Sequence, residues 1–190
     1  TIVTEAVYSA SNIPEPDSSQ GEVEWVPDRQ VHLTLDQNSI GAGSKTIDAV
    51  CDGVNIFALE SFGYIGWVYT SERAYIHKYT KSGVYAGVSF WVDNFLSAIE
   101  TVDGDFYCTS IGGFVRKRDS SGALIDTFDV TSIAQNPVGI CHDGTRFYVL
   151  DRASAKVIGF DSSFVADGYE FDIAVNNLSL YGLRHKDGIF

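Results

Sequence analysis

A short phrase recurs four times along the chain and constrains its possible folds more than any other feature. Each copy has an apolar segment, then Asp-Gly, then a segment rich in aromatic residues, and the copies contain Gly53, Gly104, Gly144 and Gly188. These glycines are 51, 40 and 44 residues apart. The phrase predicts strands joined by tight turns, because glycine adopts a positive φ easily and Asp accepts hydrogen bonds from nearby backbone amides.

A second repeated phrase keeps step with the first. An alternating segment ends in a turn at 76–83, 115–122 and 157–164, and a further apolar stretch follows each turn. Two signals in phase at about 40–50 residues are typical of propeller blades, each of which is a four-stranded antiparallel unit. We therefore predict an all-β fold. It would be a β-propeller-like stack of antiparallel meander units, with three to four blades in this chain and an extended N-terminal arm.

The domain organisation follows from the same phrases. Residues 9–21 are polar and contain two of the four prolines, so residues 1–30 are predicted to form an extended arm rather than a helix. Residues 31–190 would form the repeat domain. Its predicted units span about 45–93, 94–132 and 133–174, with a partial unit at 175–190.

Three units and a fraction are fewer than the roughly four to eight blades of a closed propeller. The chain could be part of a longer polypeptide, its copies could assemble, or a strand at 31–35 could complete the partial unit. An open stack would expose sheet faces and an unpaired strand edge. We therefore favour a homo-oligomer or a larger assembly.

Composition narrows the class of protein. The chain is 45% hydrophobic and 13% aromatic, which excludes intrinsic disorder. Its net charge of −12, without basic runs, argues against nucleic acid or an anionic membrane surface as a partner. No apolar run approaches the ~18 residues of a membrane span, so no membrane insertion is expected. The three cysteines lack zinc-site spacing, and we interpret Cys51, Cys108 and Cys141 as buried apolar side chains.

The first unit carries an insertion of about ten residues between Leu59 and Ala74. It contains four aromatic residues among glycines: Phe62, Tyr64, Trp67 and Tyr69. Aromatic rings stack on sugars and anchor partner proteins, so one interpretation is a binding platform. The other interpretation is a longer strand pair that covers the blade edge.

Two resemblances extend this interpretation. Residues 45–190 resemble the six-bladed propeller repeats of the NHL type and their relatives, which include the gluconolactonase-like enzymes. The arm from Tyr8 to Asp17, with Glu22-Val23-Glu24-Trp25 after it, resembles the N-terminal segment of some tailed-bacteriophage virion proteins. The second resemblance implies a structural or adhesive component of a particle. The residues of the arm that we expect to contact a neighbouring subunit are Ile13, Pro14, Pro16 and Trp25.

The first resemblance also implies a candidate metal site. Lactonase-like propellers bind a divalent cation with asparagine and acidic side chains on the loops that enter the innermost strands. Asn94, Asn136 and Asn177 precede that strand in three successive units, and Glu100 lies nearby. Their oxygens suit calcium. Their register is imperfect, however, and asparagine is a common turn residue, so we expect turn chemistry and no cofactor, with calcium as the alternative.

The functional prediction follows. No nucleophile elbow or Gly-rich phosphate loop occurs in the sequence, and no catalytic residue is predicted. We expect a non-enzymatic structural or binding module of a larger assembly, most simply a phage tail or surface component. The expected location is a virion or an extracellular surface. The expected partners are other protein subunits, with a carbohydrate or receptor as a further ligand. The alternative is a calcium-dependent lactonase-like hydrolase.

Overall fold

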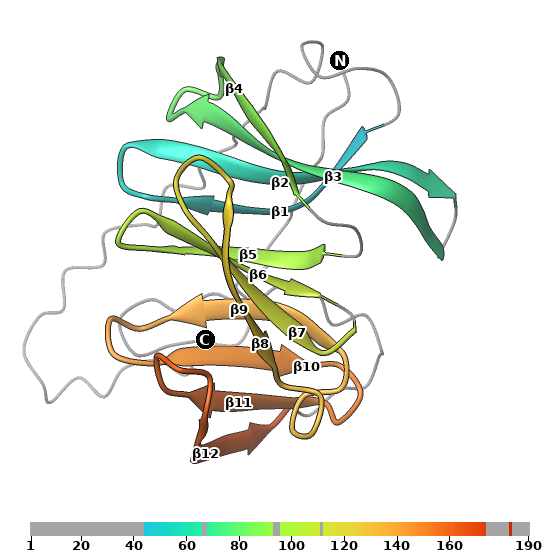
Figure 1. Cartoon of the computed structure of the whole chain (residues 1–190), viewed down its shortest axis with the longest axis vertical. Helices are drawn as coiled ribbons and strands as arrows, with labels where there is room; N and C mark the ends of the chain where they lie inside the picture. Colours follow the sequence, from blue (N-terminus) through green and yellow to red (C-terminus); the bar gives the residue numbers. More distant parts are fainter. Residues whose placement is uncertain (1–43, 66–67, 93–95, 111, 174–182, 184–190) are drawn as a thin grey trace, which may run out of the picture.

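The computed structural model describes residues 44–65, 68–92, 96–110, 112–173 and 183. Every regular element in these residues is a β-strand, and the strands form three antiparallel sheets that lie one above another (Figure 1). In the same residues, no helix is long and apolar enough to cross a membrane.

The first sheet contains β1 (Ser44–Cys51), β2 (Asn55–Ile65), β3 (Val68–Thr80) and β4 (Tyr85–Val92). The second contains β5 (Leu96–Val102), β6 (Asp105–Ser110), β7 (Phe114–Arg118) and β8 (Leu124–Asp129). The third contains β9 (Pro137–His142), β10 (Phe147–Asp151), β11 (Lys156–Phe160) and β12 (Ala166–Asp172).

The strands of each sheet pair in chain order, so that each sheet is a simple meander. The first strands of the sheets, β1, β5 and β9, contact one another from sheet to sheet. Blades arranged about a propeller axis contact one another through their innermost strands in the same way. The predicted all-β, propeller-like stack of meander units is thus confirmed, while the predicted N-terminal arm lies outside the described residues.

The first strand of every sheet carries a β-bulge at an equivalent place. The extra residues, which have no partner in the neighbouring strand, are Ile47, Ser97 and Val138. A bulge bends a strand and re-aims the side chains beyond it. Because all three sheets share it, residues at equivalent positions after the bulge face the same way, and the sheets can be compared residue by residue.

Apolar side chains fill two junctions between the sheets. The first junction joins the first and second sheets through Val50, Phe57, Leu59, Ala74, Ile76, Val92, Leu96, Ile99, Phe106 and Cys108. The second junction joins the second and third sheets through Ala98, Tyr107, Val115, Val130, Ala134, Ile140, Phe147, Val149, Ile158, Phe160 and Phe164. Burial of these faces is the main force that holds the stack together.

Two polar contacts tie the first strands of neighbouring sheets together. The carboxylate of Asp48 on β1 accepts a hydrogen bond from the backbone amide of Ile99 on β5, at 3.0 Å. The buried Ser97 on β5 donates its hydroxyl to the carbonyl of Pro137 on β9, at 2.6 Å. Each contact satisfies a backbone group at the edge strand of a sheet, where the ladder provides no partner.

The Asp-Gly turns have the local chemistry that the sequence predicts. Asp103 and Gly104 both have positive φ, 52° and 86°, as a two-residue hairpin turn requires. In the longer turns, Asp52 and Asp143 each accept hydrogen bonds from the backbone amides two and three residues further on, at 2.6 to 2.8 Å. These aspartates and glycines therefore shape the turns.

The turns between third and fourth strands are also equivalent. They begin at Thr80, Asp119 and Asp161, and in each the side-chain oxygen accepts a hydrogen bond from the backbone amide four residues on, at 3.0 to 3.2 Å. The fourth residue of each turn has a positive φ: it is Gly83 (82°), Gly122 (85°) and Phe164 (57°). Phenylalanine in the third copy is unusual, because a side chain makes this conformation costly.

The cysteine prediction needs one correction. Cys108 and Cys141 are buried as predicted, but Cys51 is exposed, and all three are free thiols. Cys51 is the last residue of β1 and adjoins the exposed turn at Asp52 and Gly53, where no neighbouring sheet covers it.

Candidate functional site

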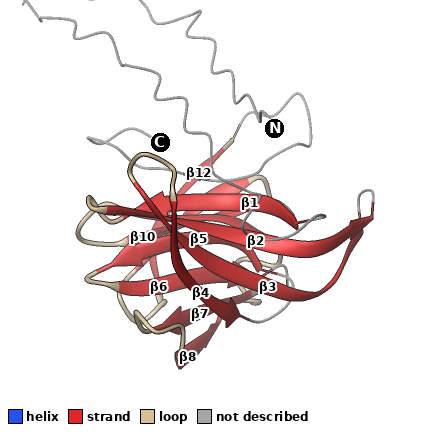
Figure 2. Ribbon diagram, turned by 90° about the horizontal axis from the view of Figure 1, so that it is seen from above, coloured by secondary structure: helices blue, strands red, loops and turns tan. Residues whose placement is uncertain are grey.

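The insertion in the first unit forms a projecting two-stranded ribbon. β2 and β3 contain 11 and 13 residues, whereas the strands of the other two sheets contain five to seven. β1 pairs with β2 only as far as Phe62, and β4 pairs with β3 only from Ala74. Beyond these points, within the described residues, β2 and β3 pair only with each other. They extend past the rest of the sheet (Figures 1 and 2). We call residues 63–65 and 68–73 the ribbon.

The predicted aromatic residues lie in and beside this ribbon. Phe62 and Tyr64 belong to β2 and Tyr69 to β3, and the backbone register places Tyr64 opposite Tyr69. Trp67 lies outside the described residues. The backbone therefore has the longer strand pair of the second interpretation, and the binding platform remains a hypothesis about the same segment.

The other predicted sites fall mostly outside the described residues. This is true of Asn94 and Asn177, and of the whole predicted arm contact: Ile13, Pro14, Pro16 and Trp25. Of the two described metal candidates, Glu100 accepts a hydrogen bond from the amide of Thr101 at 2.7 Å. The backbone amide of Asn136 donates to the carboxylate of Asp151 at 2.7 Å, whereas its side-chain Oδ1 is buried and accepts no hydrogen bond from the described residues.

Within the described part of the chain, no three His, Cys, Asp or Glu side chains converge in a way that could hold a metal ion. The calcium site therefore remains a prediction, because two of its four candidate residues, Asn94 and Asn177, lie outside the described residues.

The first sheet buries a polar cluster that the sequence did not reveal. Glu60 is 0% exposed and His77 is 4% exposed. The hydroxyl of Tyr79 donates to Glu60 Oε1 at 2.9 Å, and His77 Nε2 lies 3.9 Å from Glu60 Oε2. The ring of His77 stacks on that of Tyr75, with the centroids 5.7 Å apart, and meets Tyr85 edge-on at 6.0 Å. The sequence signal was the alternation Tyr75, His77, Tyr79, which places all three on one face of β3.

The charge state of this cluster follows from its burial. Burial lowers the pKa of His77, because an imidazolium ion loses its hydration there. The Glu60 carboxylate would favour the charged form, but at 3.9 Å it makes no hydrogen bond to the ring. We therefore take His77 as neutral at neutral pH. A neutral imidazole that stacks on Tyr75 and meets Tyr85 edge-on packs the face of the sheet.

Comparison with known proteins bears on the fold. No family model matches the chain, and no curated protein sequence matches it. Among solved structures, a Bacteroides caccae protein of unknown function is similar with a TM-score of 0.52 and 12% identity, over 70% of this chain and 47% of that one. A glutaminyl cyclase of Myxococcus xanthus has a TM-score of 0.43 and 11% identity, over 62% of this chain and 47% of that one. The chain spans about half the length of each of these structures. At 12% identity, the first similarity shows a shared fold alone.

Proposed function

We propose that this chain is a non-enzymatic structural and binding module of a larger assembly, and that the ribbon is its contact element. The observation that carries the proposal is the extent of β2 and β3 beyond their neighbours β1 and β4. A two-stranded ribbon is only marginally stable by itself, and its outer edges present unpaired backbone N–H and C=O groups. A partner that adds a strand or packs against the ribbon would satisfy both needs.

The composition of the ribbon supports a protein partner. Aromatic residues dominate the energetics of protein interfaces, and the segment from Phe62 to Tyr69 carries four of them. The sheets behind the ribbon provide a rigid support, because two apolar junctions fix them to one another. A rigid support reduces the entropy lost on binding.

The setting that we propose is a virus particle, in which the chain is a phage tail or surface component. The support for this setting is the resemblance of residues 8–17 and 22–25 to virion proteins. In this proposal residues 1–30 attach the module to a neighbouring subunit, and the ribbon contacts another subunit or a receptor. The finer relationship to NHL-type repeats is part of the same proposal and rests on the Asp-Gly phrases.

The test is a variant in which Asn-Gly replaces residues 63–72, so that β2 and β3 are joined by a two-residue hairpin turn. We expect the wild-type chain to form an oligomer or to enter its native particle, as measured by light scattering and by particle stoichiometry. The shortened variant should keep its thermal stability and lose assembly. A control that retains the ribbon but replaces Phe62, Tyr64, Trp67 and Tyr69 with serine separates backbone pairing from aromatic anchoring.

Two results would refute the proposal. One is a wild-type chain that remains monomeric and does not enter its particle. The other is a shortened variant that assembles normally. Calorimetric titration with calcium tests the hydrolase alternative separately, because a bound cation would give saturable heat.

A further inference from the structure

A cavity of about 190 Å³ lies between the first and second sheets, at the end of the first junction where the Asp-Gly turns lie. Its lining residues are Asp52, Phe57, Lys78, Phe90, Thr101, Gly104, Phe106 and Ser120. Two cross-strand pairs face each other across it: Phe57 with Lys78, and Thr101 with Phe106. The ring of Phe106 meets that of Phe57 edge-on with centroids 4.8 Å apart, and the ring of Phe90 lies 5.6 Å from it.

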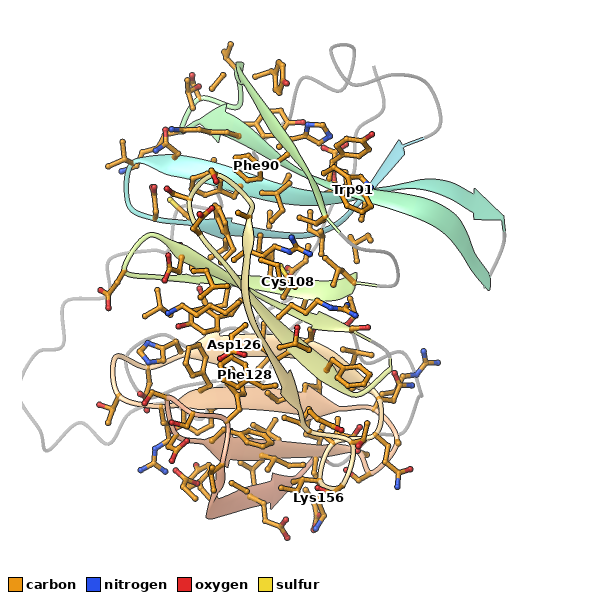
Figure 3. The ribbon with its side chains drawn as sticks, in the orientation of Figure 1. Phe90, Trp91, Cys108, Asp126, Phe128 and Lys156 are labelled. Atoms are coloured by element: carbon orange, nitrogen blue, oxygen red, sulfur yellow. The ribbon has the colours of Figure 1, made fainter. Side chains whose placement is uncertain are left out.

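The equivalent place in the second junction is filled by the side chain of Phe164. The register shows that Tyr107 there corresponds to Phe57, and Phe147 corresponds to Phe106. The ring of Phe164 lies 6.0 Å from that of Tyr107 and 4.7 Å from that of Phe147. It also lies 4.6 Å from the ring of Phe128 on β8, the counterpart of Phe90 on β4. Phe128 lies between the second and third sheets (Figure 3).

The first junction lacks this ring because its turn carries glycine. Gly122 and Phe164 are both the fourth residue of a turn between third and fourth strands, and both have a positive φ. Four aromatic rings lie within 6.0 Å of the Phe164 ring, and the counterparts of three of them line the cavity. The fourth, Phe160, corresponds to Arg118, which is not among the lining residues. The second junction therefore shows that three such aromatic residues can pack around one six-membered aromatic ring.

The two junctions also differ in charge. Lys117, the counterpart of Lys78, forms an ion pair with Asp105, with Nζ and Oδ2 3.0 Å apart. Asp105 is the first residue of β6, and the first residue of β2 is Asn55, which is neutral. Within the described residues, Lys78 forms no ion pair, and its Nζ lies 5.9 Å above the ring of Phe57. The first junction thus lacks both the ring and the carboxylate that the second junction supplies from the chain.

We infer that this cavity binds a small aromatic carboxylate, with one ring and one acidic group. The ring would lie among Phe57, Phe90 and Phe106, as Phe164 lies among their counterparts. The carboxylate would pair with the ammonium of Lys78, and charge-assisted hydrogen bonds of this kind are about twice as strong as neutral ones. Mostly apolar walls with a few placed polar groups are typical of small-molecule sites.

The carboxylate of Asp52 also lines the cavity, but its hydrogen bonds go to its own turn rather than to Lys78. Both carboxylate oxygens of Asp52 accept hydrogen bonds from its own turn, at 2.6 and 2.8 Å from backbone amides and at 3.2 Å from the side chain of Asn55. Its pKa is lowered: burial alone would raise it, but these hydrogen bonds outweigh burial, and the charge of Lys78 adds to their effect. Asp52 therefore stays ionised within its turn, and the ligand supplies the direct partner of Lys78.

The test uses phenylacetate as the probe and benzyl alcohol as the uncharged comparison, both with the purified wild-type chain. We expect saturable binding of phenylacetate by ligand-observed NMR. In protein-observed spectra, the backbone amide signals of Thr101, Gly104 and Ser120 should shift. Benzyl alcohol should bind about tenfold more weakly, because it cannot pair with Lys78. Equal binding of the two probes, no saturable binding, or shifts confined to other residues would overturn the inference.

Variants sharpen the test. Lys78→Met, which keeps the apolar stem, should weaken phenylacetate binding about tenfold. Lys117→Met is the matched control, since its ammonium is already paired and its junction already filled, and it should leave binding unchanged. An unchanged affinity in Lys78→Met, or an equal loss in both variants, would also overturn the inference. If Lys78→Met does not fold, the comparison of the two probes on the wild-type chain decides alone.

Discussion

The ring centroid of Phe164 lies 4.6 Å from that of Phe128, so the turn between β11 and β12 is packed on the last strand of the preceding sheet. The first junction makes the corresponding contact without a side chain. There a Cβ atom on Gly122 would lie only 2.7 Å from the Cβ atom of Phe90. One turn position thus joins neighbouring sheets in both copies, by close backbone approach at Gly122 and by an aromatic ring at Phe164.

Two substitutions at position 164 should differ in stability, with glycine costing less free energy of unfolding than alanine. Phe164→Ala removes a buried ring, which costs about 3–5 kcal/mol of the free energy of unfolding. It also leaves a Cβ atom at a φ of 57°. Phe164→Gly creates a slightly larger cavity but relieves the left-handed conformation, which is worth about 1 kcal/mol. We therefore expect the glycine variant to be more stable than the alanine variant in urea denaturation. The opposite order would show that Phe164 carries no backbone strain.

Two glycines with the same conformation should respond differently to alanine. Gly104 and Gly122 have φ of 86° and 85°. A Cβ atom on Gly104 would meet nothing within 4 Å, whereas one on Gly122 would overlap Phe90. Gly104→Ala should cost about 1 kcal/mol through its backbone alone. Gly122→Ala should cost about 3 kcal/mol, because overpacking adds to the backbone term.

The double variant Phe90→Gly with Gly122→Ala checks the cause, because only glycine at position 90 removes the Cβ atom that would lie 2.7 Å from a Cβ on Gly122. The two substitutions should be coupled, so that together they cost less than the sum of the single changes. Strict additivity in thermal unfolding would exclude a direct clash between these two positions.

His77 should make the stability of the fold fall in mild acid. Burial holds its pKa below the ordinary value of 6.5, so the folded chain keeps it neutral while the unfolded chain takes up a proton. The contribution of neutral His77 to the free energy of unfolding is complete above pH 6.5 and is lost as the pH falls below that value. A single proton gives a slope of at most about 1.4 kcal/mol per pH unit. In His77→Phe, which keeps a ring beside Tyr75, the slope should become smaller without vanishing, because burial also lowers the pKa of His142. Equal slopes in the two proteins between about pH 7 and 5.5 would show that His77 does not titrate on unfolding.

Much of the fold could be predicted because its signals are local. The Asp-Gly turns at Asp52 and Asp143 depend on neighbours two and three residues away, and the repeat period depends on their spacing. The link between Tyr79 and Glu60 could not be predicted in this way. It joins residues 19 apart, and only the pairing of β2 with β3 brings the two side chains to the same face of the sheet. The exposure of Cys51 likewise depends on what covers the end of β1.

The sequence contains the cause of the cavity, which is a difference between two copies of one turn. The turn that begins at Asp119 reads Asp-Ser-Ser-Gly, and the one that begins at Asp161 reads Asp-Ser-Ser-Phe. Gly122 and Phe164 occupy the same turn position in two copies. This difference predicts a cavity only once the strand register places three aromatic residues around that position. Repeats therefore predict the blades, and departures from the repeat mark where one junction differs from the other.

Two substitutions should create in the second junction the binding site that we infer for the first. Phe164→Ala opens the second junction, but Lys117 remains paired with Asp105, so phenylacetate should still bind at one site. Adding Asp105→Asn frees the ammonium of Lys117 and reproduces the arrangement of Lys78 with Asn55. We therefore expect the double variant to bind phenylacetate at two sites, with new amide shifts around Tyr107 and Phe147 in a folded protein. The single variant Asp105→Asn, whose ring of Phe164 still fills the space, should bind at one site. A second site in that single variant, or one site in a folded double variant, would show that ring and charge do not together define the site.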